Sequence, residues 1–353
     1  MISDFLSTPL DSCAPRMAYS GSPRARKPAM YRGTPPTFTS TLRCVQSGSD
    51  IGLPGDSWEI QLTPDGNVQK DGPVDGIIDL FAPLPRFSVG VAQTRGLRQY
   101  MEDYVCSCHL ERNKDVIGVF DGHNGDQAAK QAATLLGSSV RNYMLLDDVH
   151  FIDLFCHLHK KIATETDSGT TGTVLYLGQD TVKVGFVGDC SVFLLGKDGI
   201  TRITNPHRCG MAMEEKRIVA NGGRIEEASG VRRVNGVINV TRTLGDRNLH
   251  PPLTFEPEIV SINVKKGYSH IVITTDGVDT VDIEEMEKLI RRSPSMSIAA
   301  SSIRNEAFKQ KSKDNISVVV VDLKFSQYER RTTSPLVDDF CIPGTDEPNP
   351  FDF

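Results

Sequence analysis

Short apolar segments bounded by turn residues follow one another through the middle of this 353-residue chain, from Phe87 to about Phe325. Runs of this length that are rich in Val, Ile, Leu and Phe are typical of buried β-strands. The pattern predicts ten strands: FSVGVAQ (87–93), YVCSCHL (104–110), DVIGVF (115–120), GTVLYLG (172–178), TVKVGFVG (181–188), SVFLLG (191–196), GVINVT (236–241), EIVSINV (258–264), HIVITT (270–275) and NISVVVVDL (315–323).

Turn signals and helical periodicity indicate how these strands are connected. Gly178-Gln179-Asp180, Lys197-Asp198-Gly199 and Asn235-Gly236 predict antiparallel hairpins. Apolar residues at helical spacing predict five helices, near 125–143, 150–165, 213–223, 282–292 and 296–310. Pairs of helices between runs of hairpins predict an α+β fold in which helices cover β-sheets.

The two ends of the chain differ from its middle. Residues 1–86 are rich in Pro, Ser, Gly and Thr, and residues 326–353 are acidic and rich in Pro. Such segments bury too little apolar surface to offset the entropy of ordering them. We therefore expect an irregular extension (1–86), a folded domain (87–325) and a solvated tail (326–353). Within the extension, SWEIQLTPDGNVQK (57–70) predicts a small hairpin.

Composition excludes several classes of protein. The net charge of -6 and the pI near 5.8 argue against a general nucleic-acid binder, which needs a basic surface. No apolar run approaches the roughly 20 residues that cross a bilayer, and the start of the chain lacks the features of a secretory signal. The eight cysteines form no CxxC pair, which favours reduced thiols. We expect an intracellular, cytoplasmic protein, with nuclear, cytoskeletal or ciliary association left open.

Carboxylates stand at the edges of five apolar segments, which is more than turn and cap chemistry requires. They are Glu102 with Asp103, Asp121, Asp189, Asp276 and Asp314. If these strand ends meet, the carboxylates repel one another unless cations neutralise them. Hard oxygen ligands favour Mg²⁺ or Mn²⁺ over zinc or copper. Two such ions about 4 Å apart suit the attack of water on a phosphate ester.

Seven segments resemble the metal-dependent Ser/Thr protein phosphatases of type 2C, and they occur in that family's order. They are RQYMED (98–103), FDGHNG (120–125), SGTTGTVLYL (168–177), FVGDCSVFLL (186–195), NVTRTLGD (239–246), TTDGVD (274–279) and KDNISVVVV (313–321). The resemblance implies two packed antiparallel β-sheets flanked by pairs of α-helices. It also implies hydrolysis of phosphoserine or phosphothreonine in protein substrates, at a centre of two ions at one end of the sandwich.

The resemblance also implies roles for single residues. Asp121 bridges both ions and the carbonyl of Gly122 completes one coordination shell, while Asp276 and Asp314 ligate the other ion. Glu102 and Asp103 bind directly or through water. Arg98 binds the substrate phosphate through its bidentate guanidinium, and His123 protonates the leaving oxygen. Arg242 with Asp246 is expected to form a buried polar support.

One departure from the family concerns a third metal site. The family commonly has an aspartate four positions after the one matched by Asp276, where this chain has Thr280, and Asp279 lies one position early. Because that aspartate would act together with Asp189, the third site is in question.

Two alternatives remain open from the sequence. The chain can be a pseudophosphatase that keeps the fold and recruits partners, or a structural component whose two terminal arms bind a large assembly. Retention of the predicted metal ligands and of Arg98 argues against the first alternative.

Overall fold

The computed structural model describes residues 87–110, 114–141, 147–178, 181–263 and 267–323. It also describes three short strands that precede them, β1 (Arg43–Val45), β2 (Ser57–Leu62) and β3 (Val68–Asp71). The small hairpin predicted within residues 57–70 is confirmed, because β2 and β3 pair in antiparallel fashion. The chain beyond residue 323, which includes the predicted solvated tail, lies outside the described residues.

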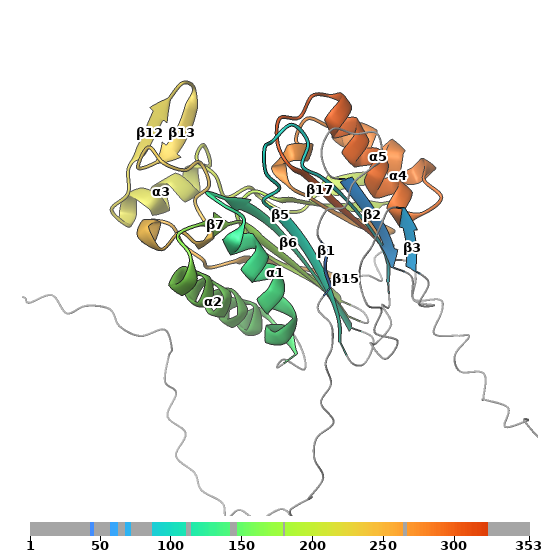
Figure 1. Ribbon diagram of the computed structural model, residues 1–353, viewed down its shortest axis with the longest axis horizontal. Helices are drawn as coiled ribbons and strands as arrows, with labels where there is room; N and C mark the ends of the chain where they lie inside the picture. The colour runs from blue at the N-terminus through green and yellow to red at the C-terminus, as the bar shows by residue number, and fades with distance from the viewer. Residues whose placement is uncertain are drawn as a thin grey trace, which may run out of the picture. The chain divides into compact units, whose positions relative to one another are not determined.

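Two antiparallel sheets form the centre of the fold (Figure 1). The first has the order β1, β5 (Asp103–Leu110), β6 (Lys114–His123), β8 (Gly172–Leu177), β9 (Thr181–Val187) and β15 (Glu258–Asn263). Two short strands extend it at the end of β6: β7 (Gly169–Thr170) pairs with β6, and β14 (Leu244–Gly245) pairs with β7. The second has the order β11 (Gly199–Arg202), β10 (Ser191–Gly196), β16 (His270–Thr274), β17 (Ile316–Asp322), β4 (Ser88–Thr94), β2 and β3.

The strands are continuously apolar because both faces of each sheet are covered. In β17, Val319 and Val321 lie in the core between the two sheets, while Val318 and Val320 face the helices on the outside. The alternation follows from the two-residue period of a strand. The predicted sandwich of two packed sheets is therefore confirmed.

The five predicted helices are all present. Helices α1 (Gln127–Val140) and α2 (Asp148–Glu165) cover the first sheet, and α4 (Ile283–Arg292) and α5 (Met296–Lys309) cover the second. Asp147 caps α2 by accepting a hydrogen bond from the backbone N–H of His150. Within the described part of the chain, no helix is long and apolar enough to cross a membrane.

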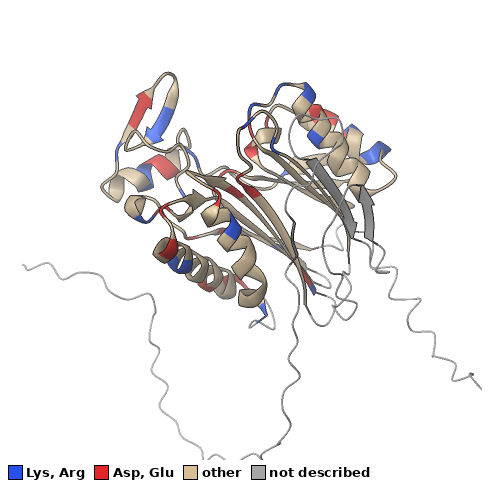
Figure 2. Cartoon of the chain, viewed as in Figure 1, with Lys and Arg blue, Asp and Glu red and all other residues tan. Residues whose placement is uncertain are grey.

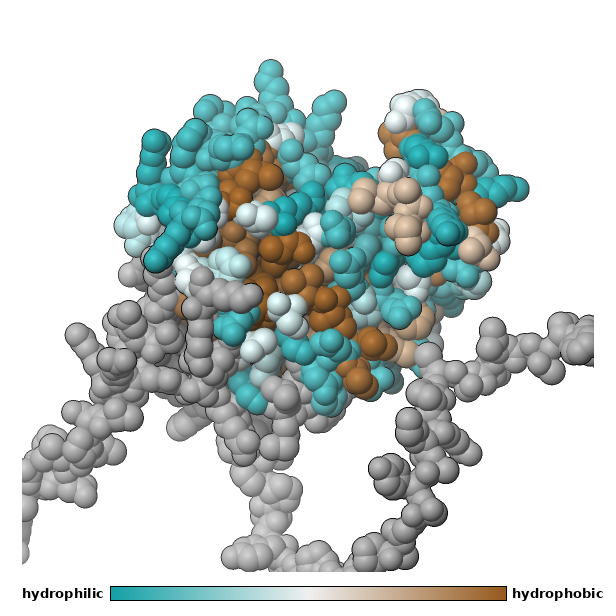
Figure 3. Space-filling model, turned by 180° about the vertical axis from the view of Figure 1, so that it is seen from behind, coloured by the Kyte–Doolittle hydropathy of each residue, from teal (hydrophilic) through white to brown (hydrophobic). Residues whose placement is uncertain are grey.

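A lobe inserted between β11 and β14 stands beside the sandwich. It contains α3 (Ala212–Ala220) and the hairpin of β12 (Ile225–Ala228) and β13 (Val231–Val234), built around a small apolar core. Seen from behind, a notch with mostly hydrophilic borders separates this lobe from the body of the molecule (Figure 3).

The predicted strand 236–241 is wrong. Asn235 and Gly236 form the predicted turn, with φ of 52° and 74°, but only isolated bridges follow, at Ile238 and Val240. Both side chains instead fill the small core of the lobe. An apolar run can complete a core without finding a long partner strand, so its composition alone does not distinguish the two cases.

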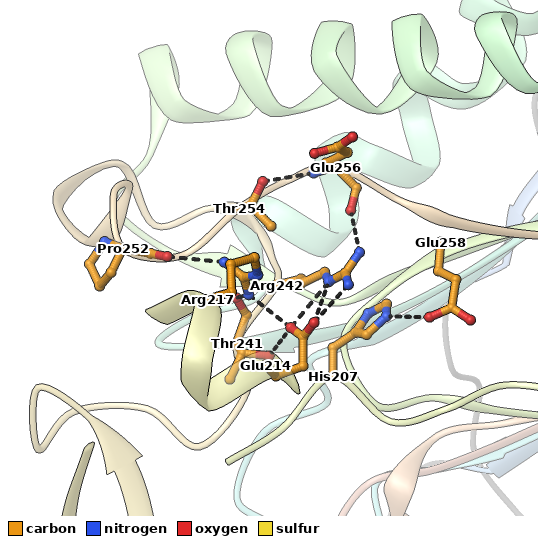
Figure 4. Close-up of polar contacts among 9 residues, drawn as sticks. All are labelled: His207, Glu214, Arg217, Thr241, Arg242, Pro252, Thr254, Glu256 and Glu258. Carbon is orange, nitrogen blue, oxygen red and sulfur yellow. Dashed lines mark hydrogen bonds and ion pairs between the residues drawn. The ribbon is translucent and has the colours of Figure 1, made fainter. Parts of the chain in front are cut away.

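The lobe is attached to the sandwich through Glu214 on α3 (Figure 4). Its carboxylate accepts hydrogen bonds from Arg217 at 2.8 Å, from Arg242 at 2.7 Å and from the hydroxyl of Thr241 at 2.6 Å. Burial acts to raise the pKa of Glu214, but the bonds from Arg242 and Arg217 outweigh it and lower the pKa to about 2. The predicted support between Arg242 and Asp246 is therefore wrong, because Arg242 pairs with Glu214.

We predict that Glu214→Gln destabilises the protein by about 3 kcal/mol, because two largely buried arginines lose their shared counter-charge. The free energy of unfolding in urea, extrapolated to water, measures this loss. Glu285→Gln is the matched control, since Glu285 forms a 3.0 Å ion pair with Lys288 on the exposed face of α4. The control should cost no more than about 1 kcal/mol. Equal losses in the two variants would contradict the proposed attachment.

Candidate active site

A cavity of about 740 Å³ lies between one end of the sandwich and the inserted lobe. Seven of the nine predicted site residues line it: Arg98, Glu102, Asp121, Gly122, His123, Asp276 and Asp314. The wall opposite is supplied by the lobe and the segment after it, and includes Arg233, Val237, Ile238, Asn239, Val240, Asp246, Asn248 and Leu249. The other two predicted residues, Asp103 and Asp189, do not line the cavity.

Strand pairing explains why carboxylates from distant segments meet here. In the first sheet, Asp103 at the start of β5 is paired with Asp121 near the end of β6. In the second sheet, Thr274 at the end of β16 is paired with Val318 near the start of β17. The residues just beyond these ends, Asp276 and Asp314, therefore lie at one edge, and acidic residues are visible where the strand ends converge (Figure 2).

Asp103 lies behind the cavity and joins the two sheets. Its Oδ2 accepts hydrogen bonds from Thr275 Oγ1 at 3.0 Å and from Ser317 Oγ at 2.7 Å. Ser317 belongs to β17 of the second sheet, and Thr275 directly follows β16 of the same sheet. Asp103 is only 4% exposed. A buried carboxylate of this kind fixes the spacing of the strand ends, which positions Asp121 opposite it.

Burial and mutual repulsion act on the carboxylates of the site. Burial, together with the charges of Asp189 and Asp314, raises the pKa of Asp276 to about 8. Burial and the neighbouring Asp103 and Asp276 raise the pKa of Asp121 well above its usual value. Burial likewise raises the pKa of Asp103 to about 7, although Ser317 and Thr275 donate hydrogen bonds to it. The site therefore favours any cation that neutralises it.

Gly122 is required by close packing of the backbone. Its N–H donates to the carbonyl of Glu102 at 3.1 Å, and a Cβ at this position would lie 2.6 Å from the same oxygen. The side chain of Glu102 accepts a hydrogen bond from the backbone N–H of Gly125 at 2.7 Å. Asn315 accepts from the N–H of Glu102 at 2.8 Å. The segment 98–103 is thereby held against β6 and β17.

Arg98 reaches the cavity from the loop before β5. Its Nη2 donates to Asp314 at 2.6 Å and its Nε donates to the carbonyl of Lys313 at 3.1 Å. The side chain is 53% exposed, and that of Asp314 is 36% exposed. An exposed pair of this kind is held weakly, so the guanidinium is free to turn towards a bound phosphate.

His123 is paired with an aspartate that the sequence assigned to a different role. His123 Nε2 lies 2.8 Å from Oδ2 of Asp246, which is 6% exposed. Asp246 has a positive φ of 46°, and its N–H donates to the carbonyl of Ser168 at 3.2 Å. The nearby Gly169 leaves room for it, since a Cβ there would overlap the Asp246 carboxylate. The backbone conformation of Asp246, its hydrogen bond to Ser168 and the space left by Gly169 thus place the Asp246 carboxylate beside the imidazole of His123.

Asp189 is held by a cation of the chain itself. Arg208 Nε lies 3.4 Å from Asp189 Oδ2, and Arg208 Nη2 lies 3.2 Å from Asp279 Oδ2. Asp189 lies close enough to Asp121 and Asp276 to repel both. It therefore belongs electrostatically to the site, while its carboxylate faces Arg208.

Three residues of the site were not anticipated from the sequence in these roles. Asp246 orients His123, Asn315 holds Glu102, and Arg208 binds Asp189 and Asp279. Asn315 had a detectable signal, since it follows Asp314 at a strand start. The pairings of Asp246 and Arg208 depend on segments brought together only by folding.

The donor set fits divalent cations that prefer oxygen. Six carboxylates line the cavity: Glu102, Asp121, Asp167, Asp246, Asp276 and Asp314. Burial and neighbouring negative charges raise the pKa values of Asp121 and Asp276, so a divalent cation with oxygen ligands would relieve the repulsion there. In the described part of the chain, no three His, Cys, Asp or Glu side chains converge as a preformed ion site. Ligation by Glu102, Asp103, Asp121, Gly122, Asp276, Asp314 and Asp189 stays a prediction.

We predict that uptake of Mg²⁺ or Mn²⁺ near pH 7 releases protons, because ligation requires the charged form of carboxyls such as Asp276, whose pKa is about 8. Isothermal titration calorimetry in buffers of different ionisation heat counts these protons. Release should fall towards zero near pH 9.5, and Asp276→Asn should release fewer protons at pH 7. A binding heat at pH 7 that is independent of the buffer would contradict the prediction.

The pH dependence of stability has a defined sign in the absence of ions. The folded-state pKa values of Asp103 and Asp276, about 7 and about 8, lie above those of an unfolded chain. Their contribution to stability is therefore complete below about pH 4 and is lost progressively as the pH rises to 7 for Asp103 and 8 for Asp276. Added divalent ions should reverse this loss.

Comparison with known proteins gives consistent results. Residues 87–316 match the model of the protein phosphatase 2C family. A probable protein phosphatase 2C of Arabidopsis thaliana is 29% identical over 263 residues, which cover 71% of this chain and 84% of that protein.

Solved structures show the same fold. A sex-determining protein of C. elegans matches with a TM-score of 0.64 and 24% identity, over 68% of this chain and 65% of that chain. A serine-threonine phosphatase 2C from Toxoplasma gondii matches with a TM-score of 0.59 and 18% identity, over 67% of this chain and 94% of that chain. The family match covers more than half of the sequence and contains every residue that lines the cavity. The chain therefore belongs to the protein phosphatase 2C family of protein serine/threonine phosphatases.

Proposed function

We propose that this protein hydrolyses phosphoserine and phosphothreonine in protein substrates, in a reaction that depends on two Mg²⁺ or Mn²⁺ ions. The observation that carries the proposal is the convergence of Asp121, Asp276 and Asp314 in a cavity that also presents Arg98 and His123. Divalent ions held by such carboxylates supply a water-derived nucleophile and neutralise phosphate charge. The family membership supports the same reaction class.

The residues of the chain divide the remaining tasks. The Arg98 guanidinium leaves Asp314 and binds two oxygens of the phosphate, which its planar fork suits. His123 holds the proton for the leaving serine or threonine oxygen. Asp246, whose carboxylate lies 2.8 Å from Nε2 of His123, orients the ring.

The wall formed by the lobe limits what can reach this centre. Val237, 58% exposed, lines the cavity, and its carbonyl accepts a hydrogen bond from Arg233 at 2.9 Å. We expect a phosphorylated side chain of a protein substrate to enter between this wall and the strand ends.

The comparisons give no support to the pseudophosphatase alternative. A larger assembly that binds the terminal arms, and a cytoplasmic location, stay predictions. Most of residues 1–86 and all of residues 326–353 lie outside the described residues.

The direct test is turnover of a phosphothreonine peptide by the full chain, with Mn²⁺ or Mg²⁺ present or chelated. We expect turnover only with the ion, and a loss on the order of 10³-fold in Asp276→Asn, since ion catalysis supplies several kcal/mol. Asp282→Asn is the matched control, because Asp282 is an exposed aspartate six positions further along that makes no capping hydrogen bond. Turnover that is unaffected by chelation would overturn the proposal.

The role of His123 can be tested through the leaving group. We predict that His123→Gln lowers kcat about 10²-fold with phosphothreonine, whose alkoxide must be protonated. The same variant should lose far less with p-nitrophenyl phosphate, whose leaving group needs no proton. Asp246→Asn should show the same selectivity with a smaller loss. Equal losses on both substrates would instead assign His123 to binding or to folding.

A further inference from the structure

Arg208 joins two carboxylates that come from different sheets. Asp189 follows β9 of the first sheet, and Asp279 follows the short 3-10 turn Asp276–Val278 after β16 of the second. Both carboxylates face one guanidinium, at 3.4 Å and 3.2 Å. They therefore converge on a single point beside Asp276, and that point is occupied by a side chain of the protein.

The position of Arg208 is fixed by the backbone on both sides of it. The N–H of His207 donates to the carbonyl of Gly188 at 2.9 Å, directly before Asp189. Arg208 itself forms a bridge with Val240, which lines the cavity. Arg208 thus connects the buried Asp189, Asp279 of the segment after β16, and the cavity wall at Val240.

This pair differs from the pair of Arg98 and Asp314. Asp189 is only 4% exposed and Arg208 is 30% exposed, whereas both members of the other pair are more than a third exposed. An exposed guanidinium can leave its partner at little cost. A buried carboxylate that loses its cation is left uncompensated, which is strongly unfavourable. Arg208 is therefore expected to remain in place when the site is filled.

A second arginine adds positive charge at the same place. Arg202, on β11, interacts electrostatically with both Asp189 and Asp279, and it is half-buried. Two cations of the chain thus face two carboxylates. Among the carboxylates that line the cavity, Asp314 is paired with the exposed Arg98, which is held weakly, whereas Asp121 and Asp276 repel each other. We therefore expect external cations to bind there.

We propose that Arg208 acts as a built-in cation between Asp189 and Asp279, so that the metal centre of this protein takes two divalent ions and no third. The inference rests on the proposed function. Arg208 is a positioning residue in this scheme: it neutralises Asp189 and Asp279 and connects the cavity wall to them. The third site that Thr280 put in question is replaced by a side chain.

The test is the number of Mn²⁺ ions bound per chain, from equilibrium dialysis with detection of free Mn²⁺ by electron paramagnetic resonance. The wild-type chain should saturate at two ions. Arg208→Gln should take up a third ion with a dissociation constant of about 1 mM, because two carboxylates around one point then keep only the half-buried Arg202 nearby. In the presence of a chelator, the same variant should unfold about 5 °C earlier, and millimolar Mn²⁺ should restore it.

Three variants serve as controls. Arg208→Lys keeps the charge and should bind two ions. The double variant Asp189→Asn, Arg208→Gln removes the pair together, and should bind two ions with most of the stability regained. Arg224→Gln removes an exposed ion pair with Glu226 on the lobe and should change neither readout.

The outcomes separate the inference from the proposed function. Three ions bound to the wild-type chain would overturn the inference and leave metal-dependent hydrolysis intact. Two ions and unchanged stability in Arg208→Gln would also overturn the inference. No ions bound to the wild-type chain would overturn the proposed function, and the inference would fall with it.

Discussion

The electrostatic cost of placing buried carboxylates at one end of a β-sandwich governs this structure. Asp103, Asp121 and Asp276 are there because antiparallel pairing brings strand ends of both sheets to the same edge. Burial, and after it the repulsion from neighbouring carboxylates, raises their pKa values. The buried negative charge must be compensated, and hydroxyl donors, arginines and bound divalent cations can each do this. The same compensation links the stability of the fold to its chemistry.

The protein stabilises these carboxylates in different ways. The innermost carboxylate, Asp103, is held by hydroxyl groups of the second sheet and serves the architecture. The intermediate ones line the cavity and remain available to ions. Arginines neutralise two others: Arg98 forms an exposed pair with Asp314, and Arg208 pairs with Asp189, which is as buried as Asp103. A cluster of like charges can therefore serve structure and catalysis at once.

The inserted lobe, which supplies the cavity wall, is also held by pairs of opposite charge. Glu214 neutralises Arg217 and Arg242 where α3 meets the segment that returns to the first sheet (Figure 4). Ion pairs of Glu214 therefore help to hold the lobe in place, and Arg208 adds a second attachment through its bridge with Val240 and its pairs with Asp189 and Asp279. Because both attachments are electrostatic and partly buried, the geometry of the wall depends on the same charges that shape the site.

Nine of the ten predicted strands and all five helices were determined by the sequence itself, because strand and helix patterns are local. Seven of the residues that line the cavity were also identified from the sequence, the carboxylates from their places at strand ends and Arg98, Gly122 and His123 from the family resemblance. The strand at 236–241 failed because its apolar residues fill the core of the lobe. Only the tertiary structure decided which charges pair. Arg98 and Asp314 are 216 positions apart, and His123 and Asp246 are 123 apart. Partners so distant are chosen by the path of the chain, since a carboxylate has no local preference among arginines and histidines.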